Sequence, residues 1–152
     1  EDNVSNQVKK SKPESKVTTP ITAAIKAFKK LNLKNIAVLT PYPKDVNETV
    51  FNYLSKNQLT VDSFNSFNLN YDSEIAQVSL ESLKESIGNI DLEKVDGLFV
   101  SCTALKIVDI LDQVEKIFNT TVISSNQAII WDCIQLLDMN VKMPGYGKLF
   151  NS

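Results

Sequence analysis

Apolar and polar positions along the chain alternate with two different spacings, which predict strands interleaved with helices. Residues 36–39 and 97–100 are short apolar runs, typical of strands buried on both faces of a parallel sheet. Residues 60–67 alternate in polarity, which predicts a strand nearer an edge, and residues 121–123 predict a fourth strand. Helices are expected over about residues 20–31, 45–57, 80–90, 103–118 and 126–139, with a long loop over 68–77.

Four strand-and-helix units in succession predict an α/β fold, a doubly wound four-stranded parallel sheet with helices on both faces. Right-handed crossovers favour the strand order 2-1-3-4, which is flavodoxin-like. The first helix should begin at Thr19, a good N-cap, with Pro20 in its first position. Residues 1–16 are polar and lack apolar periodicity. We therefore expect a solvated polar tail over 1–16 and one α/β lobe over 17–152.

Composition excludes several classes of function. The net charge of -2 offers no footprint for nucleic acid or an anionic membrane, and no apolar run is long enough to cross a bilayer. Histidine is absent from the sequence, which excludes Ser-His-Asp triads, Cys-His dyads and His-based zinc sites within it. Neither of the glycine-rich phosphate-binding motifs occurs, so nucleotides are poor candidates. Acid–base chemistry would fall to Cys, Asp, Glu, Lys or Tyr.

Two cysteines are too few for a disulfide framework, which fits a reducing, cytoplasmic compartment. Ligands of doubly wound sheets bind beyond the carboxyl ends of the strands where the strand order reverses, here between the first and third strands. This rule brings Tyr42 and Cys102 to two walls of one crevice. A strand-to-helix junction at Cys102 would supply backbone N–H groups and a helix dipole that favour a thiolate or a bound anion. The alternative is a small buried side chain at a strand end.

The other candidates each have a structural alternative. Tyr42 is either a hydrogen-bond donor to an oxyanion or a packed loop residue, and Asn47 follows the predicted N-cap Asp45 as a polar residue of a first turn. Residues 124–126 favour helix capping, with Asn126 as the cap, over ligand binding. Cys133 shares a predicted apolar helix face with Ile129, Ile130, Ile134 and Leu137. We therefore expect Cys133 to pack in the core and to be the inert thiol.

Three motifs then follow one another along the chain. They are Thr40-Pro41-Tyr42 with Val46-Asn47, the segment FVSCTAL at 99–105, and the segment SSNQA at 124–128 with Trp131. Weaker motifs flank them, VTTP at 17–20 and GYGKLF at 145–150. In this order and spacing the chain resembles the maleate isomerase and arylmalonate decarboxylase branch of the aspartate/glutamate racemase superfamily over about residues 17–150.

The resemblance implies an enzyme with two α/β lobes that holds a small carboxylic acid between them and needs no metal or organic cofactor. It implies that Cys102 is the catalytic cysteine of the second lobe. Tyr42 and Asn47 would help to bind the carboxylate, and the backbone at Thr103 and Ala104 would help to form an anion hole. The polar residue that the family carries after the second strand matches Asn70, Asp72 or Ser73.

The sequence has no counterpart of the first lobe, so we expect a fragment or a truncated member, with residues 1–16 as a remnant of that lobe. A Cys or Gly facing Cys102 from the first lobe would separate isomerase or racemase from decarboxylase, and all three reactions stay open. The expected partners are a small carboxylate and either the missing lobe or a second copy, and the face around Tyr42, Cys102 and Ser125 should be concave or apolar. The alternatives are a flavodoxin-like or periplasmic-type module that only binds a ligand, and a self-associating half-protein without catalysis.

Overall fold

A four-stranded parallel sheet forms the centre of the computed structural model, which describes residues 2–151. The strands are β1 (Asn35–Thr40), β2 (Thr60–Ser66), β3 (Gly97–Val100) and β4 (Thr121–Ser124). Their order is β2-β1-β3-β4, and all three neighbouring pairs are parallel. The predicted α/β class, strand order and central position of the third strand are confirmed.

Burial explains the polarity of the strands. Every residue of β3 is buried, because helices cover both faces of this central strand. No residue of β2 is fully buried, as expected of an edge strand with an alternating pattern. Along β1, Ile36 and Val38 pack into one core and Ala37 and Leu39 into the other, so this single strand serves both faces.

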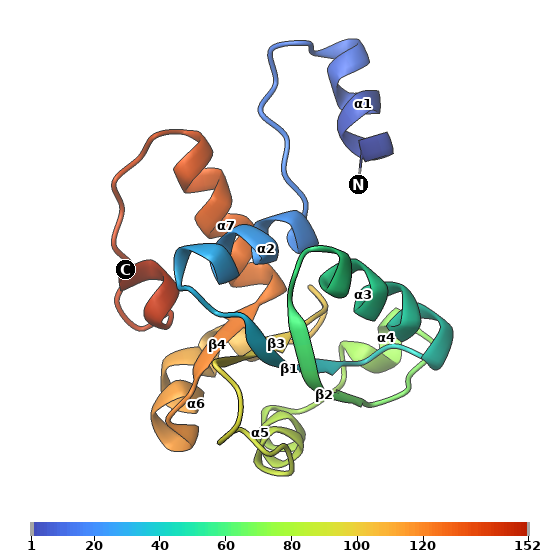
Figure 1. Cartoon of the computed structure of the whole chain (residues 1–152), viewed down its shortest axis with the longest axis vertical. Coiled ribbons are helices and arrows are strands. Elements are labelled where there is room, and N and C mark those ends of the chain that lie inside the picture. Colours follow the sequence, from blue (N-terminus) through green and yellow to red (C-terminus); the bar gives the residue numbers. More distant parts are fainter. Residues whose placement is uncertain (1, 152) are drawn as a thin grey trace.

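Two layers of helices enclose the sheet (Figure 1). The first core is covered by α2 (Pro20–Lys30), α3 (Lys44–Lys56) and α7 (Ser125–Leu136). The second is covered by α4 (Asp72–Ile75), α5 (Leu80–Gly88) and α6 (Leu111–Phe118). Phe28 of α2 meets Phe99 of β3 edge to face at 5.4 Å between ring centroids, which ties the first helical layer to the centre of the sheet.

Helix starts confirm one predicted cap and correct two. Thr19 caps α2 as expected, and its side chain accepts a hydrogen bond from the Thr22 amide at 3.4 Å. The N-cap of α3 is Pro43, so the prediction of Asp45 was wrong. Ser124 caps α7 in place of Asn126, because Ser124 and Gln127 exchange backbone and side-chain hydrogen bonds in a capping box.

Three segments differ from the sequence-based expectation. The polar segment at the N-terminus contains helix α1 (Asp2–Ser11), which stands apart from the sheet in Figure 1 and leaves Val4 and Val8 exposed. The expected loop over 68–77 contains α4. The expected helix after residue 103 starts later, because the 3-10 helix η1 (Ile107–Ile110) precedes α6. None of the helices in residues 2–151 has the length and apolar character needed to cross a membrane.

Part of the core is contributed by the irregular segment between β3 and α6. Leu105 and Ile107 are both buried, and they are only two positions apart. Both side chains reach the second core from the turn and the 3-10 helix that follow β3. The segment after β3 is a turn, and this turn carries Cys102.

The C-terminal segment returns to the body of the lobe through a turn and ends in the 3-10 helix η2 (Lys148–Asn151). Gly147 has φ of +82°, and a Cβ there would lie 2.8 Å from Gln127 Nε2, so the position requires glycine. Gln127 donates to the Tyr146 carbonyl at 2.7 Å, and Glu115 accepts from the Lys148 amide at 2.9 Å. These contacts fix the tail beside β4.

Candidate functional site

A pocket of about 390 Å³ opens where β1 and β3 end. Tyr42, which follows β1, and Cys102, which follows β3, both line it, and Ser125 adds the start of α7. The expected meeting of Tyr42 and Cys102 at the reversal of strand order is confirmed, as is the concave surface around these three residues. The other walls come from α2 and α3 through Pro20, Ile21, Thr49, Val50 and Tyr53.

The backbone at Cys102 adopts a conformation that side chains disfavour. Its φ is 132°, a value that glycine tolerates and other residues reach only under strain. Neighbouring elements hold it there: the Cys102 amide donates to Ser125 Oγ at 3.1 Å, and the Ser101 amide donates to the Leu39 carbonyl at 2.9 Å. Strain that the surroundings enforce in this way is characteristic of functional positions.

The sulfur of Cys102 has a hydrogen-bond donor of its own. The Ala104 amide donates to Cys102 Sγ at 3.4 Å, within the turn that follows β3. The side chain is only 9% exposed. We predicted that the helix following Cys102 would supply the N–H groups and the dipole, and this was wrong because α6 begins only at Leu111. The donor comes from the turn, and the helix that starts beside Cys102 is α7.

The turn at Cys102 is also tied to α7 beyond Ser125. Asn126 Nδ2 donates to the Thr103 carbonyl at 2.9 Å, and Thr103 itself lines the pocket. Ser125 is 3% exposed, so its hydroxyl is shielded from bulk solvent and interacts with groups of the site. The preference for capping was therefore right for Ser124 alone, since Ser125 and Asn126 support the loop that carries Cys102.

The phenol of Tyr42 is a hydrogen-bond donor at neutral pH. Burial raises the pKa of Tyr42 above its ordinary value of 10.0, and the Cys102 side chain adds to the increase. An interaction with the Ser101 side chain opposes this shift, and the negative charge of Asp72 reinforces it. Of the three polar candidates after the second strand, Asp72 is thus the one whose charge acts on Tyr42. A protonated phenol beside a thiol suits the binding of an anion.

Asn47 lies outside the pocket of Cys102. Its Nδ2 donates to the Tyr42 carbonyl at 2.7 Å, and its Oδ1 accepts from Thr40 Oγ1 at 2.5 Å. Asn47 instead lines a separate groove between α3 and β2. The Asn47 side chain therefore does not face the pocket in which a substrate would contact Cys102. It contacts the backbone of the segment that carries Tyr42.

Cys133 is exposed, so the prediction that it packs in the core was wrong. The buried face of α7 is formed by Ala128, Trp131 and Asp132, while Ile130 is 49% exposed. Apolar residues occur around the whole of α7, and periodicity alone could not select the inner face. Asp132 faces inward because it pairs with Lys26 Nζ at 2.7 Å and Thr18 Oγ1 at 2.5 Å.

Several residues of the pocket were not identified from the sequence as site residues. Val50 and Tyr53 contact the first core, and they also line the pocket. Ser101, which appeared only within the motif at 99–105, lines the pocket as well. Within residues 2–151 no group of three or more His, Cys, Asp or Glu side chains is arranged to hold a metal ion.

This chain is similar in sequence to known proteins. The family described as arylmalonate decarboxylase matches residues 2–150. The arylmalonate decarboxylase of Bordetella bronchiseptica is 29% identical over 143 residues, which cover 88% of this chain and 57% of that protein. The maleate isomerase of Nocardia farcinica is 24% identical over 147 residues, which cover 96% of this chain and 59% of that protein.

A solved structure supports the fold independently. A cysteine-to-serine mutant of Nocardia farcinica maleate cis-trans isomerase, with a covalently bound succinylcysteine intermediate, superimposes with a TM-score of 0.92. It is 22% identical in sequence, and the match covers 99% of this chain and 62% of that chain. This chain therefore spans less than two thirds of the length of each of these relatives.

Proposed function

Because this chain belongs to the arylmalonate decarboxylase family, we propose that it is the Cys102-bearing lobe of a cofactor-independent enzyme that transfers protons on a small mono- or dicarboxylic acid. The observation that carries the proposal is the strained Cys102 beside the protonated phenol of Tyr42 in one pocket. In this proposal Cys102 is the catalytic residue. Tyr42 and the backbone at Thr103 and Ala104 bind a substrate carboxylate.

The pocket suits an acid with one polar and one apolar part. Tyr42, Thr103 and Ser125 supply hydroxyl groups, whereas Pro20, Ile21 and Val50 form an apolar wall. A carboxylate at the hydroxyl side would be stabilised by donors that are already in place, as is any negative charge that develops during reaction. An apolar substituent would lie against the wall.

Cys102 can serve either reaction type of the family without being consumed. In a decarboxylation, the bond to the leaving carbon dioxide breaks, its electron pair remains as an enediolate, and the thiol gives its proton to that carbon. The thiolate then recovers a proton from water. In an isomerisation, the thiolate adds to one alkene carbon, the other carbon carries the negative charge, and rotation followed by elimination restores the thiolate.

We further propose that the site is completed by a second α/β lobe. The chain spans less than two thirds of the length of its relatives. All the residues that line the pocket of Cys102 lie between Pro20 and Ser125 of this one lobe. In this proposal residues 17–152 form one lobe, and residues 1–16 belong to the connection with the other. The second lobe would come from the same polypeptide or from a second copy of this chain.

The test is product formation by the full chain with maleate and with phenylmalonate, followed as fumarate and as carbon dioxide. We expect turnover that Cys102→Ala abolishes and Cys133→Ala leaves unchanged, because only Cys102 lies in the pocket. If a second copy completes the site, specific activity should rise with protein concentration. Turnover that survives Cys102→Ala would refute the proposal.

A second candidate is a catalytically inactive half-domain that binds a carboxylate or associates with itself. The fraction of the relatives that the chain spans favours it, since residues from the remaining part would be lacking. Saturable binding of succinate without turnover of either acid, at any protein concentration, would select this candidate over the enzyme.

A further inference from the structure

The backbone carbonyl of Tyr42 accepts hydrogen bonds from two side chains that do not line the pocket of Cys102. Asn47 Nδ2 of α3 donates to it at 2.7 Å, and Ser66 Oγ at the end of β2 donates at 2.6 Å. The two donors belong to separate elements that meet at this one oxygen atom. Two short hydrogen bonds from different directions restrict both the position and the orientation of the peptide group.

These donors are themselves held in place. Asn47 Oδ1 accepts from Thr40 Oγ1, and Thr40 is completely buried at the end of β1. Ser66 Oγ accepts from the Asn68 amide at 3.0 Å. The clamp formed by Asn47 and Ser66 is thus continuous with the buried end of β1 and with the loop that follows β2.

The local sequence explains why side chains are needed here. Tyr42 lies between Pro41 and Pro43, and proline has no backbone N–H group. The segment therefore has few amide donors with which to anchor itself as an ordinary turn does. Pro41 gains one anchor through its carbonyl, which accepts from the Leu69 amide at 2.7 Å, but Tyr42 depends on Asn47 and Ser66.

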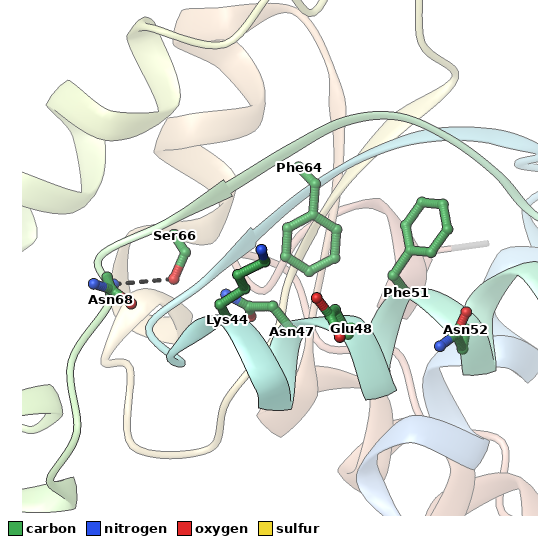
Figure 2. A pocket seen from close by; sticks show the side chains of 8 residues that line it. All are labelled: Lys44, Asn47, Glu48, Phe51, Asn52, Phe64, Ser66 and Asn68. Carbon is green, nitrogen blue, oxygen red and sulfur yellow. Dashed lines mark hydrogen bonds between the residues drawn. The ribbon is translucent and has the colours of Figure 1, made fainter.

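Both donors also line a second groove, of about 640 Å³, between α3 and β2 (Figure 2). Figure 2 shows Asn47 and Ser66 toward one end of this groove and Phe51 toward the other. Substitutions made from the groove side can therefore loosen the Tyr42 segment without removing any group from the wall of the Cys102 pocket.

We propose that Asn47 and Ser66 are positioning residues that hold the phenol of Tyr42 beside Cys102. This inference rests on the proposed function for its purpose, because a fixed phenol is useful where an anion must be bound. It assigns Asn47 a role that acts through Tyr42, in place of direct contact with the substrate.

The test compares Asn47→Asp and Ser66→Ala with the matched control Asn52→Asp. Asn47→Asp keeps the acceptor for Thr40 and loses the donor to Tyr42, and Ser66→Ala loses the other donor without adding charge. Asn52 is exposed on the same helix and lines the same groove, so its variant controls for the added charge. The full chain is labelled with 3-fluorotyrosine, and Tyr42→Phe identifies the fluorine signal of Tyr42.

We expect the Tyr42 signal to move toward the position of a solvent-exposed tyrosine in Asn47→Asp and Ser66→Ala, and to stay in place in Asn52→Asp. The signals of Tyr53, Tyr71 and Tyr146 should stay in place in all three. In a Cys133→Ala background, alkylation of Cys102 should become about fivefold faster in both clamp variants, the size that loss of one hydrogen bond allows. In a Tyr42→Ala background this acceleration should disappear, because the clamp acts through the phenol.

An unchanged Tyr42 signal in the clamp variants that fold would overturn the inference, and so would an acceleration that persists without the Tyr42 side chain. Thermal unfolding identifies the variants that fold, and Ser66→Ala alone suffices if Asn47→Asp does not. Neither readout needs substrate or turnover. The clamp can thus be confirmed while the proposed function fails, or refuted while that function stands.

Discussion

The two cysteines occupy opposite kinds of environment. Cys102 is buried, has a strained backbone, and receives a hydrogen bond from the Ala104 amide at its sulfur. Cys133 is exposed near the C-terminal end of α7. The strain at Cys102 is maintained by Ser125, which belongs to the same helix as Cys133. The first residue of α7 therefore holds the backbone of Cys102, the candidate catalytic residue. About two turns later the same helix carries the exposed Cys133.

The contrast shows that burial alone does not identify a candidate catalytic thiol. Cys102 is one of the buried residues of the second core and also lines the pocket, so its burial alone does not decide its role. Cys133 has helical geometry of the ordinary kind and no described contact that needs a thiol. Conformation and hydrogen bonding distinguish the two cysteines more sharply than their accessibility does.

The largest expected effect concerns the inner and outer faces of α7. Trp131→Ala should lower the free energy of unfolding by about 3 kcal/mol, because it leaves a cavity in the first core. Cys133→Ala should change it by about 0.5 kcal/mol or less, as is usual for an exposed position. Urea unfolding of both variants measures the difference. Equal losses would mean that the inner face of α7 has been wrongly identified.

The backbone strain predicts that glycine and alanine rank in opposite order at the two cysteines. At Cys102, where φ is 132°, glycine should be more stable than alanine by about 1–2 kcal/mol because it relieves the strain. At Cys133, near the C-terminal end of α7, glycine should be less stable than alanine by up to about 1 kcal/mol. Denaturant unfolding of the four variants decides the matter. The same ranking at both positions would contradict the strained conformation.

The smallest expected effect is the pH dependence that Tyr42 confers. Because the pKa of Tyr42 is raised above 10.0, the folded chain keeps the phenol proton to higher pH than the unfolded chain does. Its contribution to stability is complete below pH 10 and is lost as the pH rises further. Between about pH 10 and 11 the unmodified chain should therefore lose stability more steeply than Tyr42→Phe, with a modest difference because solvent screens a half-buried phenol. If the free energy of unfolding falls equally steeply with pH in both chains, the pKa of Tyr42 is not raised.

Much of the fold followed from local pattern. The apolar runs of β1 and β3 and the alternation in β2 predicted the strands, and the crossover rule then predicted their order. Errors arose where a distant partner decides the outcome. The buried face of α7 depends on the pairing of Asp132 with Lys26, and α6 starts late because the 3-10 helix η1 precedes it. Hydrophobic periodicity along the sequence predicts neither of these features.

The candidate site was predictable in outline only. The rule that ligands bind where the strand order reverses predicted from the sequence alone that Tyr42 and Cys102 lie together. The supports of these residues were not predicted, because Ser125, Asn126, Asn47 and Ser66 act through hydrogen bonds to backbone groups of other segments. In the sequence such residues resemble ordinary capping or turn residues.

The central claim is that the pocket of Cys102 binds a carboxylate against the thiol, and protection from alkylation tests it most directly. Iodoacetamide modification of the full chain is followed by mass spectrometry for both cysteines, without ligand, with succinate, and with uncharged dimethyl succinate. We predict that succinate at ten times its Kd slows modification of Cys102 about tenfold, while Cys133 reacts at an unchanged rate and the ester has no effect. Equal rates at Cys102 with and without succinate, or equal protection by the ester, would contradict the claim.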